Sequence, residues 1–225
     1  MAKLLERRKA IELRRQGKSY SEIKQALSVS KSSLSLWLRN IPLNEKQLSR
    51  IKDKKEKAIE RFRESMRLKR EKRLKNYYEA QKTKWLPISK KEEFIAGLFL
   101  YWGEGNKSSR NSISINNTDP AVIKFSLYWL TRCLGVPKEK IKVQLHLYSD
   151  MDIEEGLNFW SKELALKKYQ FSKPYIKKTN KIDIDQKGFG YGTCGIMVHD
   201  TVLKENILMA MKAFSDCFGE KAAKI

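Results

Sequence analysis

The sequence predicts a multi-domain protein in which a small all-α unit is followed by a long basic helix and then by an α+β domain. Three observations support this order. Apolar residues recur with a helical period through residues 3–39, residues 45–84 contain neither Gly nor Pro, and the alternation typical of strands begins only after residue 110. We therefore expect three domains, with the boundaries 1–44, 45–88 and 89–225. The hydrophobic fraction of 41% is enough for a folded core.

Three short helices are expected in the first of these domains. Gly17 ends the first helix, Ser21 is a good N-cap for the second, and Ser30 caps a third that runs from residue 31 to about residue 39. A helix, a three-residue turn and a second helix have the spacing of a helix-turn-helix motif. Its small core is expected to comprise Ile23, Ala26, Leu27, Val29, Leu34, Trp37 and Leu38.

The outward face of the third helix points to a nucleic-acid partner. It would present Lys31, Ser32, Ser33, Ser35 and Arg39. The N-terminal residues of such a recognition helix normally meet base edges in the major groove, and short hydroxyl side chains can bond to a base or to a phosphate. The segment GKSYSEIKQALSVSKSSLSLWLR strongly resembles the helix-turn-helix segments of resolvases and of transcriptional regulators. We therefore expect binding to double-stranded DNA; the alternative is a helical hairpin without a DNA role.

The charge of the chain is placed unevenly. Of the formal net charge of +21, residues 1–44 hold +7 and residues 45–84 hold +9, so the remaining 141 residues hold only +5. Such asymmetry favours a polyanionic partner, because each Lys or Arg that meets a phosphate releases a condensed counterion. The alternative is a solvated basic surface. The long helix expected at 45–84 is consistent with a basic arm along DNA, a solvated spacer, or one half of a weak coiled coil, and the sequence leaves these three open.

Cysteine usage and hydropathy restrict the cellular setting. The three cysteines lie far apart and show no metal-ligand spacing, which argues against a structural zinc site and fits a reducing compartment. No secretory signal and no stretch of about 18 apolar residues is present. We expect a cytoplasmic, nucleoid-associated protein without a membrane partner.

The third domain alternates helices and strands. Helices are expected at 90–103 with Ser89 as the cap, at about 120–133, at 153–164 and at 201–214, and strands at 111–116, 141–148, 181–185 and 191–199. One face of the sheet should be apolar and covered by helices, while the other should be polar and basic.

The polar sheet face is a candidate DNA-binding surface. Its expected contacts are Arg110, Ser112, Ser114, Asn116, Lys142, Gln144 and His146. His146 and His199 fit either DNA contacts or polar sheet residues without a special role. The acidic residues Asp150, Asp152, Glu154 and Glu155 resemble a metal site, but an N-cap followed by acidic residues in the first helical turn explains them more simply.

Residues 96–105, AGLFLYWGEG, resemble the signature helix of the LAGLIDADG homing-endonuclease family. The expected order of elements is also similar: a helix, two strands, a helix, then further strands and a helix. The resemblance covers about residues 89–215 and includes one copy of the motif. The whole chain further resembles a family of prokaryotic proteins that join a helix-turn-helix to this domain, through residues 98–105, 145–148 and 191–194. Two departures stand out: Glu104 replaces the usual Asp, and Phe99 replaces a small residue at the helix contact.

The resemblance implies a site-specific endonuclease that works as a homodimer through the helix 90–103. Two Glu104 carboxylates, one from each subunit, would hold Mg²⁺ beside the scissile phosphates. A basic side chain would stabilise the transition state, and the candidates are Lys107, Lys177 and Lys178. The alternative is a non-catalytic DNA-binding transcriptional regulator built on the same domains, as in sporulation regulators, with Glu104 an ordinary exposed acid at a helix end.

Overall fold

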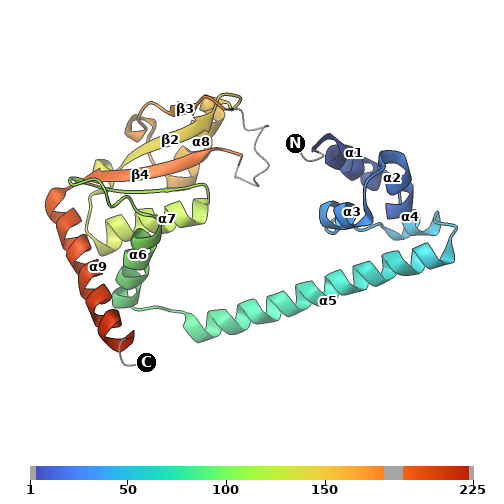
Figure 1. Ribbon diagram of the computed structural model, residues 1–225, viewed down its shortest axis with the longest axis horizontal. Coiled ribbons are helices and arrows are strands. Elements are labelled where there is room, and N and C mark those ends of the chain that lie inside the picture. The colour runs from blue at the N-terminus through green and yellow to red at the C-terminus, as the bar shows by residue number, and fades with distance from the viewer. Residues whose placement is uncertain (1–3, 180–189, 223–225) are drawn as a thin grey trace. The chain divides into compact units, whose positions relative to one another are not determined.

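The computed structural model describes residues 4–179 and 190–222, and the chain divides into two compact units, Met1–Leu86 and Pro87–Ile225 (Figure 1). The described residues of the first unit form helices and connecting segments without strands, and the unit ends in a long helix. The second unit contains four strands and several helices within its described residues. The expected order of a helical region, a long helix and an α+β region is therefore confirmed.

Helices α1 (Leu4–Arg15), α2 (Tyr20–Leu27) and α3 (Lys31–Leu38) form the body of the first unit. Gly17 follows α1 with a φ of +92°, a conformation that favours glycine. Ser30 caps α3 as expected. The expected cap of α2 was wrong, because the N-cap is Ser19: its hydroxyl accepts a hydrogen bond from the Glu22 amide, and the Glu22 carboxylate accepts one from the Ser19 amide.

Six buried residues form the core of this helical body: Ala10, Tyr20, Ile23, Val29, Leu34 and Leu38. Leu27 and Trp37 pack against this core while half-buried. Ala26 was expected in the core but is exposed, because the core face of α2 is occupied by Tyr20 and Ile23.

The single helix expected at 45–84 is instead two helices, α4 (Glu45–Ser49) and α5 (Lys54–Trp85). Helix α4 folds back on α1, since the Gln47 side-chain amide donates to the Arg15 carbonyl at 3.0 Å and Leu48 is buried. Helix α5 begins directly after its N-cap, Asp53. The Asp53 carboxylate accepts hydrogen bonds from the backbone amides of Lys55 and Glu56, at 2.8 and 3.2 Å. Helix α5 ends before Pro87, because a residue preceding proline disfavours the helical conformation.

The second unit begins with α6 (Lys90–Glu104), capped by Ser89. The remaining elements are β1 (Ser112–Asn117), α7 (Pro120–Tyr128) with its π-helical extension (Trp129–Cys133), β2 (Lys142–Tyr148), α8 (Ile153–Leu164), β3 (Tyr175–Lys177), β4 (Thr193–His199) and α9 (Thr201–Ala222). The strand order is β1-β4-β2-β3, with β4 antiparallel to both neighbours and β3 parallel to β2.

Most elements of this unit follow the expected pattern, with three differences. One strand, β1, lies between α6 and α7 where two were expected; the segment before β1 forms only an isolated bridge, between Gly105 and Ile115. Strand β3 was not expected, and the strand expected at 181–185 lies outside the described residues. Helix α9 is longer than predicted: it continues through Gly219 to Ala222 instead of ending near residue 214.

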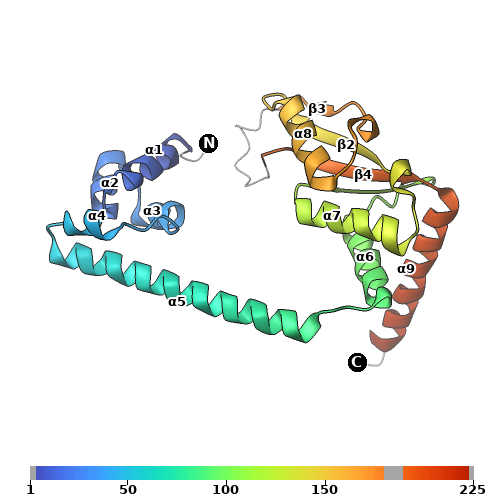
Figure 2. The ribbon, with the colours of Figure 1, turned by 180° about the vertical axis from the view of Figure 1, so that it is seen from behind.

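The apolar face of the sheet packs against α7 and α8 (Figure 2). The alternating residues of the three longer strands supply it and are almost fully buried: Ile113, Ile115, Val143, Leu145, Leu147, Ile196 and Val198. Helix α6 reaches this core only because Gly97 has no side chain. A Cβ atom at that position would lie 2.0 Å from the buried ring of Trp129.

Candidate nucleic-acid interface

Helix α3 combines a buried face with a polar outer face. Leu34 and Leu38 are buried, while Lys31, Ser32, Ser35 and Arg39 are exposed. These four side chains are therefore accessible on the side of α3 that faces away from the core. Leu36, which is 56% exposed on the same side, was not among the predicted contacts.

Ser33 differs from the other predicted contacts of α3. Its amide donates to the Ser30 hydroxyl at 3.1 Å, and the two hydroxyl oxygens lie 2.9 Å apart. Its side chain is half-buried. Ser33 therefore belongs to the N-cap of α3 rather than to its outer face.

The polar face of the sheet holds most of the other predicted contacts in cross-strand rows. Asn116 is aligned with Gly195 and Gln144, and Lys142 is aligned with Met197. Asn116, Lys142 and Gln144 are exposed, as is Arg110 just before β1. A Cβ atom at Gly195 would lie 2.0 Å from the Asn116 side-chain oxygen, so the amide of Asn116 lies directly over the glycine. Gly195 therefore leaves room for the Asn116 side chain between β1 and β2.

Ser112 and Ser114 do not belong to the exposed surface. They are only 5% and 9% exposed, because the loop before β1 folds back on the strand. The Asn106 amide donates to the Ser114 carbonyl at 2.9 Å, and the Ser109 hydroxyl lies 2.6 Å from that of Ser112. Both serines were predicted as DNA contacts, and their burial excludes direct contact in this conformation.

His146 lies beside an aromatic and basic edge of the sheet. Its ring centroid is 5.4 Å from that of Tyr175, and the Lys177 ammonium lies 4.7 Å above the Tyr148 ring. Burial and then the positive charge of Lys177 lower the pKa of His146 below its ordinary value. The imidazole is therefore neutral at pH 7 in the free protein. His199 is exposed on β4, opposite Ser112 of β1.

Glu104 is exposed at the last residue of α6, next to a cluster of hydrogen bonds that holds the following loop. The Lys107 ammonium donates to the Trp102 carbonyl at 2.8 Å, which also complements the negative end of the helix dipole. Of the three predicted lysines, Lys107 is the one that lies at this helix end. Lys177 and Lys178 lie at and after β3, at the opposite edge of the sheet from β1, about three inter-strand steps of ~4.8 Å away.

Lys204, on α9, was missed by the sequence reasoning. It is fully buried; its ammonium donates to the Asn106 carbonyl at 2.6 Å and to the Tyr101 hydroxyl. Burial and then the charge of Lys107 lower the pKa of Lys204, and burial raises the pKa of Tyr101 to about 12. No sequence signal predicts the burial of Lys204, because its spacing is that of an ordinary charged residue on an amphipathic helix. The three side chains position the loop that follows Glu104.

Among the described residues there is no group of three or more His, Cys, Asp or Glu side chains suited to a metal ion. Asp152 accepts a hydrogen bond from the Glu155 amide at 2.8 Å, so the capping interpretation of that acidic segment is confirmed. Glu154 instead forms an ion pair with Lys168.

One face of α6 is left open within a single chain. Ala96 and Gly103 are exposed and Leu100 is half-buried, and a Cβ atom at Gly103 would have no neighbour within 4 Å. Phe99 borders this line, three residues after Ala96 and four before Gly103, and is exposed. Its ring centroid is 5.6 Å from that of Phe214, so Phe99 packs towards α9.

In the part of the chain that the structure describes, we find no helix with the length and apolarity needed to cross a membrane. Comparisons with protein-family models, with curated proteins and with solved structures find no match to this chain.

Proposed function

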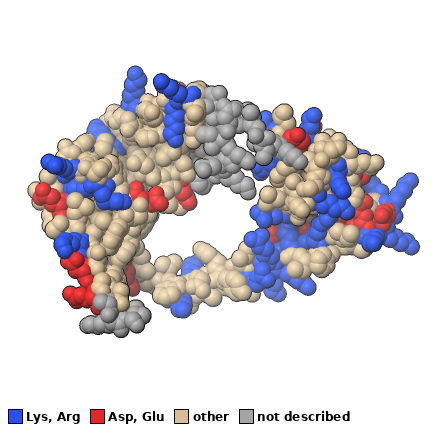
Figure 3. Space-filling view, in the orientation of Figure 1, with Lys and Arg blue, Asp and Glu red and all other residues tan. Residues whose placement is uncertain are grey.

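We propose that this protein binds double-stranded DNA sequence-specifically, with α3 as its recognition helix and the polar sheet face of the second unit as a further contact surface. The observation that carries the proposal is the division of α3 into a buried apolar face and an outer face of short hydroxyl and basic side chains. Lys and Arg side chains also gather over the first unit (Figure 3). The resemblance of residues 17–39 to helix-turn-helix segments adds support.

We further propose that the chain is a homodimeric LAGLIDADG-type endonuclease. Ala96, Leu100 and Gly103 follow one another at spacings of four and three residues, so they form one line along α6. A second copy of α6 can pack on this line around a two-fold axis. Such packing brings the two Glu104 carboxylates together. Their donor chemistry fits Mg²⁺, a hard cation that prefers carboxylate oxygens, but only when both subunits contribute.

The roles of the chain's own residues follow from that arrangement. Mg²⁺, when bound, supplies an activated water molecule and neutralises charge on the leaving oxygen. Glu104 would hold the cation. Lys107 lies at the same helix end and would interact with the developing charge on the phosphate, whereas Lys177 and Lys178, at the other edge of the sheet, would contact the DNA backbone instead. Lys204 acts indirectly, by positioning the loop that carries Lys107.

The second candidate function is a non-catalytic transcriptional regulator. It is favoured by one observation: a single chain contributes no cluster of metal-binding side chains among its described residues, so cleavage depends wholly on the dimer. In this case the same DNA-binding surfaces serve recognition alone.

One experiment separates the two functions. The protein is incubated with a randomised duplex library with and without Mg²⁺ or Mn²⁺, and both retention and cleavage are scored. We expect Glu104→Gln to abolish cleavage and to keep binding, while the exposed control Glu205→Gln changes neither. If the wild type never cleaves its tightest-bound duplex, the regulator is the correct function; if it retains no duplex, both proposals are wrong.

The binding proposal also predicts a steep dependence on salt. Neutralisation of six phosphates gives a slope of about −5 in a plot of log affinity against log salt concentration. Lys31→Ala together with Ser35→Ala should weaken binding to the selected duplex without changing thermal stability, because both side chains are exposed. A slope near zero would remove the basic surface from the interface.

A further inference from the structure

Helix α5 is held against the first unit by a buried ion pair. A guanidinium nitrogen of Arg14 lies 2.7 Å from a carboxylate oxygen of Glu60, and both side chains are only 3% exposed. Arg14 also donates to the Ile41 carbonyl at 2.9 Å, which ties the segment after α3 to the same pair. Such buried pairs contribute little net stability, but they are expensive to break, so they favour one geometry over others.

A second arginine extends this contact to Tyr20, the first residue of α2. Arg63 donates to Glu60 at 2.9 Å, and its guanidinium lies 4.0 Å from the centroid of the buried Tyr20 ring. Stacking of a guanidinium on an aromatic face adds a favourable cation–π interaction. The first half of α5 therefore has a defined position relative to α3.

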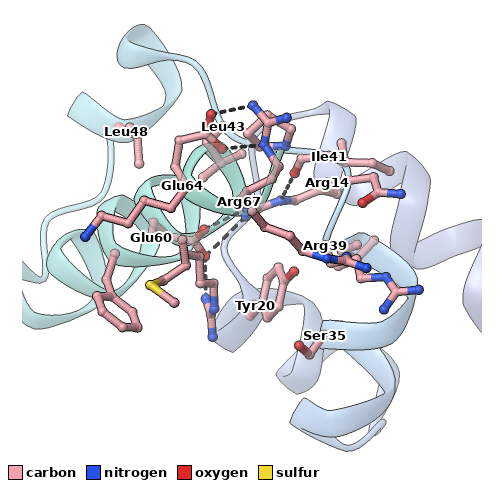
Figure 4. Close-up of a pocket in the computed structure, with 18 of the residues that line it drawn as sticks. Arg14, Tyr20, Ser35, Arg39, Ile41, Leu43, Leu48, Glu60, Glu64 and Arg67 are labelled. Atoms are coloured by element: carbon pink, nitrogen blue, oxygen red, sulfur yellow. Dashed lines mark hydrogen bonds and ion pairs between the residues drawn. The ribbon is translucent and has the colours of Figure 1, made fainter. Parts of the chain in front are cut away.

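The side of α5 that faces the end of α3 borders an open groove of about 360 Å³. Figure 4 shows this groove, with Arg39 on one wall and Glu64 and Arg67 of α5 on another. A second hollow next to it is lined by residues of the outer face of α3 and by Arg63. Arg39 and Arg63 border both hollows, so the outer face of α3 and this side of α5 form one continuous surface.

The positive charges on this surface divide into paired and unpaired groups. Arg67 is paired with Glu64 and Glu71, and Arg63 is paired with Glu60. By contrast, four exposed residues of the groove have no acidic partner among the ion pairs of the described residues: Arg39, Lys69, Arg70 and Arg73. Unpaired exposed cations in a row are available to a ligand with several negative charges.

We propose that the groove face, formed by Arg39 at the end of α3 and by Lys69, Arg70 and Arg73 of α5, binds the sugar–phosphate backbone of the duplex that α3 reads. The inference rests on the proposed DNA binding and assigns a role to the long helix. On α5, the unpaired cations from Lys69 to Arg73 lie within about 6 Å of helix length at ~1.5 Å per residue, and Arg39 lies on another wall of the groove. One strand of B-DNA presents roughly two to three phosphates over an axial length of about 6 Å. A row of cations fits this repeated anion better than it fits a small ligand with a single charge.

The contact should be independent of sequence, because phosphates carry no sequence information directly. Loss of the α5 cations should weaken binding to the selected duplex and to a scrambled duplex by the same factor. Each lost phosphate contact should also reduce the salt slope by about 0.9.

The test compares two triple variants of the full-length protein that remove the same charge. The first, Lys69→Gln/Arg70→Gln/Arg73→Gln, alters the groove face. The control, Arg61→Gln/Lys72→Gln/Lys75→Gln, alters cations that helical geometry places on the other side of α5. Affinity for selected and scrambled duplexes is measured over a range of salt concentrations, and circular dichroism checks the helix content.

We expect the groove-face variant to lose on the order of tenfold or more in affinity for both duplexes and to have a salt slope smaller by about 2.7, with a much smaller loss in the control. Equal losses in the two variants would show that only the net charge matters and would overturn the proposal. If both variants bind as the wild type does while Lys31→Ala/Ser35→Ala is impaired, the α5 contact is wrong and the proposed function stands. If the wild type binds no duplex, the proposed function itself has failed.

A small amphipathic anion is the competing occupant, since apolar residues also line the groove. Thermal shift with decanoate provides the comparison. Stabilisation of the wild type by decanoate that the groove-face variant loses, combined with an unchanged DNA affinity of that variant, would assign the groove to a small ligand and overturn the proposal.

Discussion

The buried pair of Arg14 and Glu60 allows a quantitative test of how α5 is attached. Glu60→Gln keeps the shape of the side chain and one acceptor oxygen but removes the negative charge. Arg14 would keep its hydrogen bonds to the carbonyls of Lys18 and Ile41, at 3.2 and 2.9 Å, yet its charge would be unpaired in a site that is 3% exposed. Removing one partner of a buried pair costs roughly 3–5 kcal/mol, and the remaining hydrogen bonds place this case near ~3 kcal/mol.

Native-state hydrogen exchange read by mass spectrometry is the appropriate assay, because it resolves α1–α3 from the second unit. A loss of ~3 kcal/mol corresponds to an increase of about 150-fold in the opening equilibrium of this region, with peptides of the second unit unchanged. Glu64→Gln is the matched control: it removes the ion pair with Arg67, whose side chains are 32% and 28% exposed, and such pairs contribute about 0–1 kcal/mol. Equal effects of the two substitutions would refute the reasoning. The neutral double variant Arg14→Met/Glu60→Leu should recover most of the lost stability.

Three further outcomes can be measured by equilibrium denaturation. Leu34→Ala, at a fully buried position, should cost about 2–5 kcal/mol, and Trp37→Ala should cost less because Trp37 is only half-buried; the reverse order would contradict the assigned core. Gly97→Ala forces a methyl group against the buried Trp129 ring and should destabilise the second unit by about 1–3 kcal/mol. If this variant were as stable as the wild type, α6 would have to shift away from Trp129 without cost. Burial and a neighbouring positive charge lower the pKa of His146 below 6.5, so on acidification the unfolded chain binds a proton at a higher pH than the folded chain does. The contribution of His146 to stability should therefore be full above about pH 6.5 and decrease below it. His146→Gln should remove that part of the pH dependence.

Local signals predicted the type of most elements correctly. The alternation in 141–148 predicted β2 because every second residue there is apolar and buried. The start of α2 was misplaced although its signal was present: Glu22 lies three residues after Ser19, which is the spacing of a capping box. The break between α4 and α5 was missed because it contains neither Gly nor Pro and is marked instead by the capping side chain of Asp53.

The features of the candidate site that escaped prediction depend on contacts that the local sequence pattern does not show. Ser112 and Ser114 alternate with buried isoleucines, and only the loop folded over them reveals that they are covered. Glu60 lies 46 residues from Arg14, and nothing in its neighbourhood distinguishes it from the exposed acids of a charged helix. Lys204 is separated from Tyr101 by 103 residues. A polar residue that is buried by a remote partner leaves no mark in the local pattern.

The packing of α5 through Glu60 also determines whether this segment becomes ordered during folding or only on ligand binding. A free basic arm would become ordered only on meeting its ligand, and binding would then show the large negative heat-capacity change of coupled folding. Here the first half of the helix is positioned before any ligand arrives, so that entropic cost belongs to the folding reaction. Calorimetric titration with duplex DNA should therefore show a heat-capacity change that matches the area of a rigid interface, and Glu60→Gln should make that change more negative.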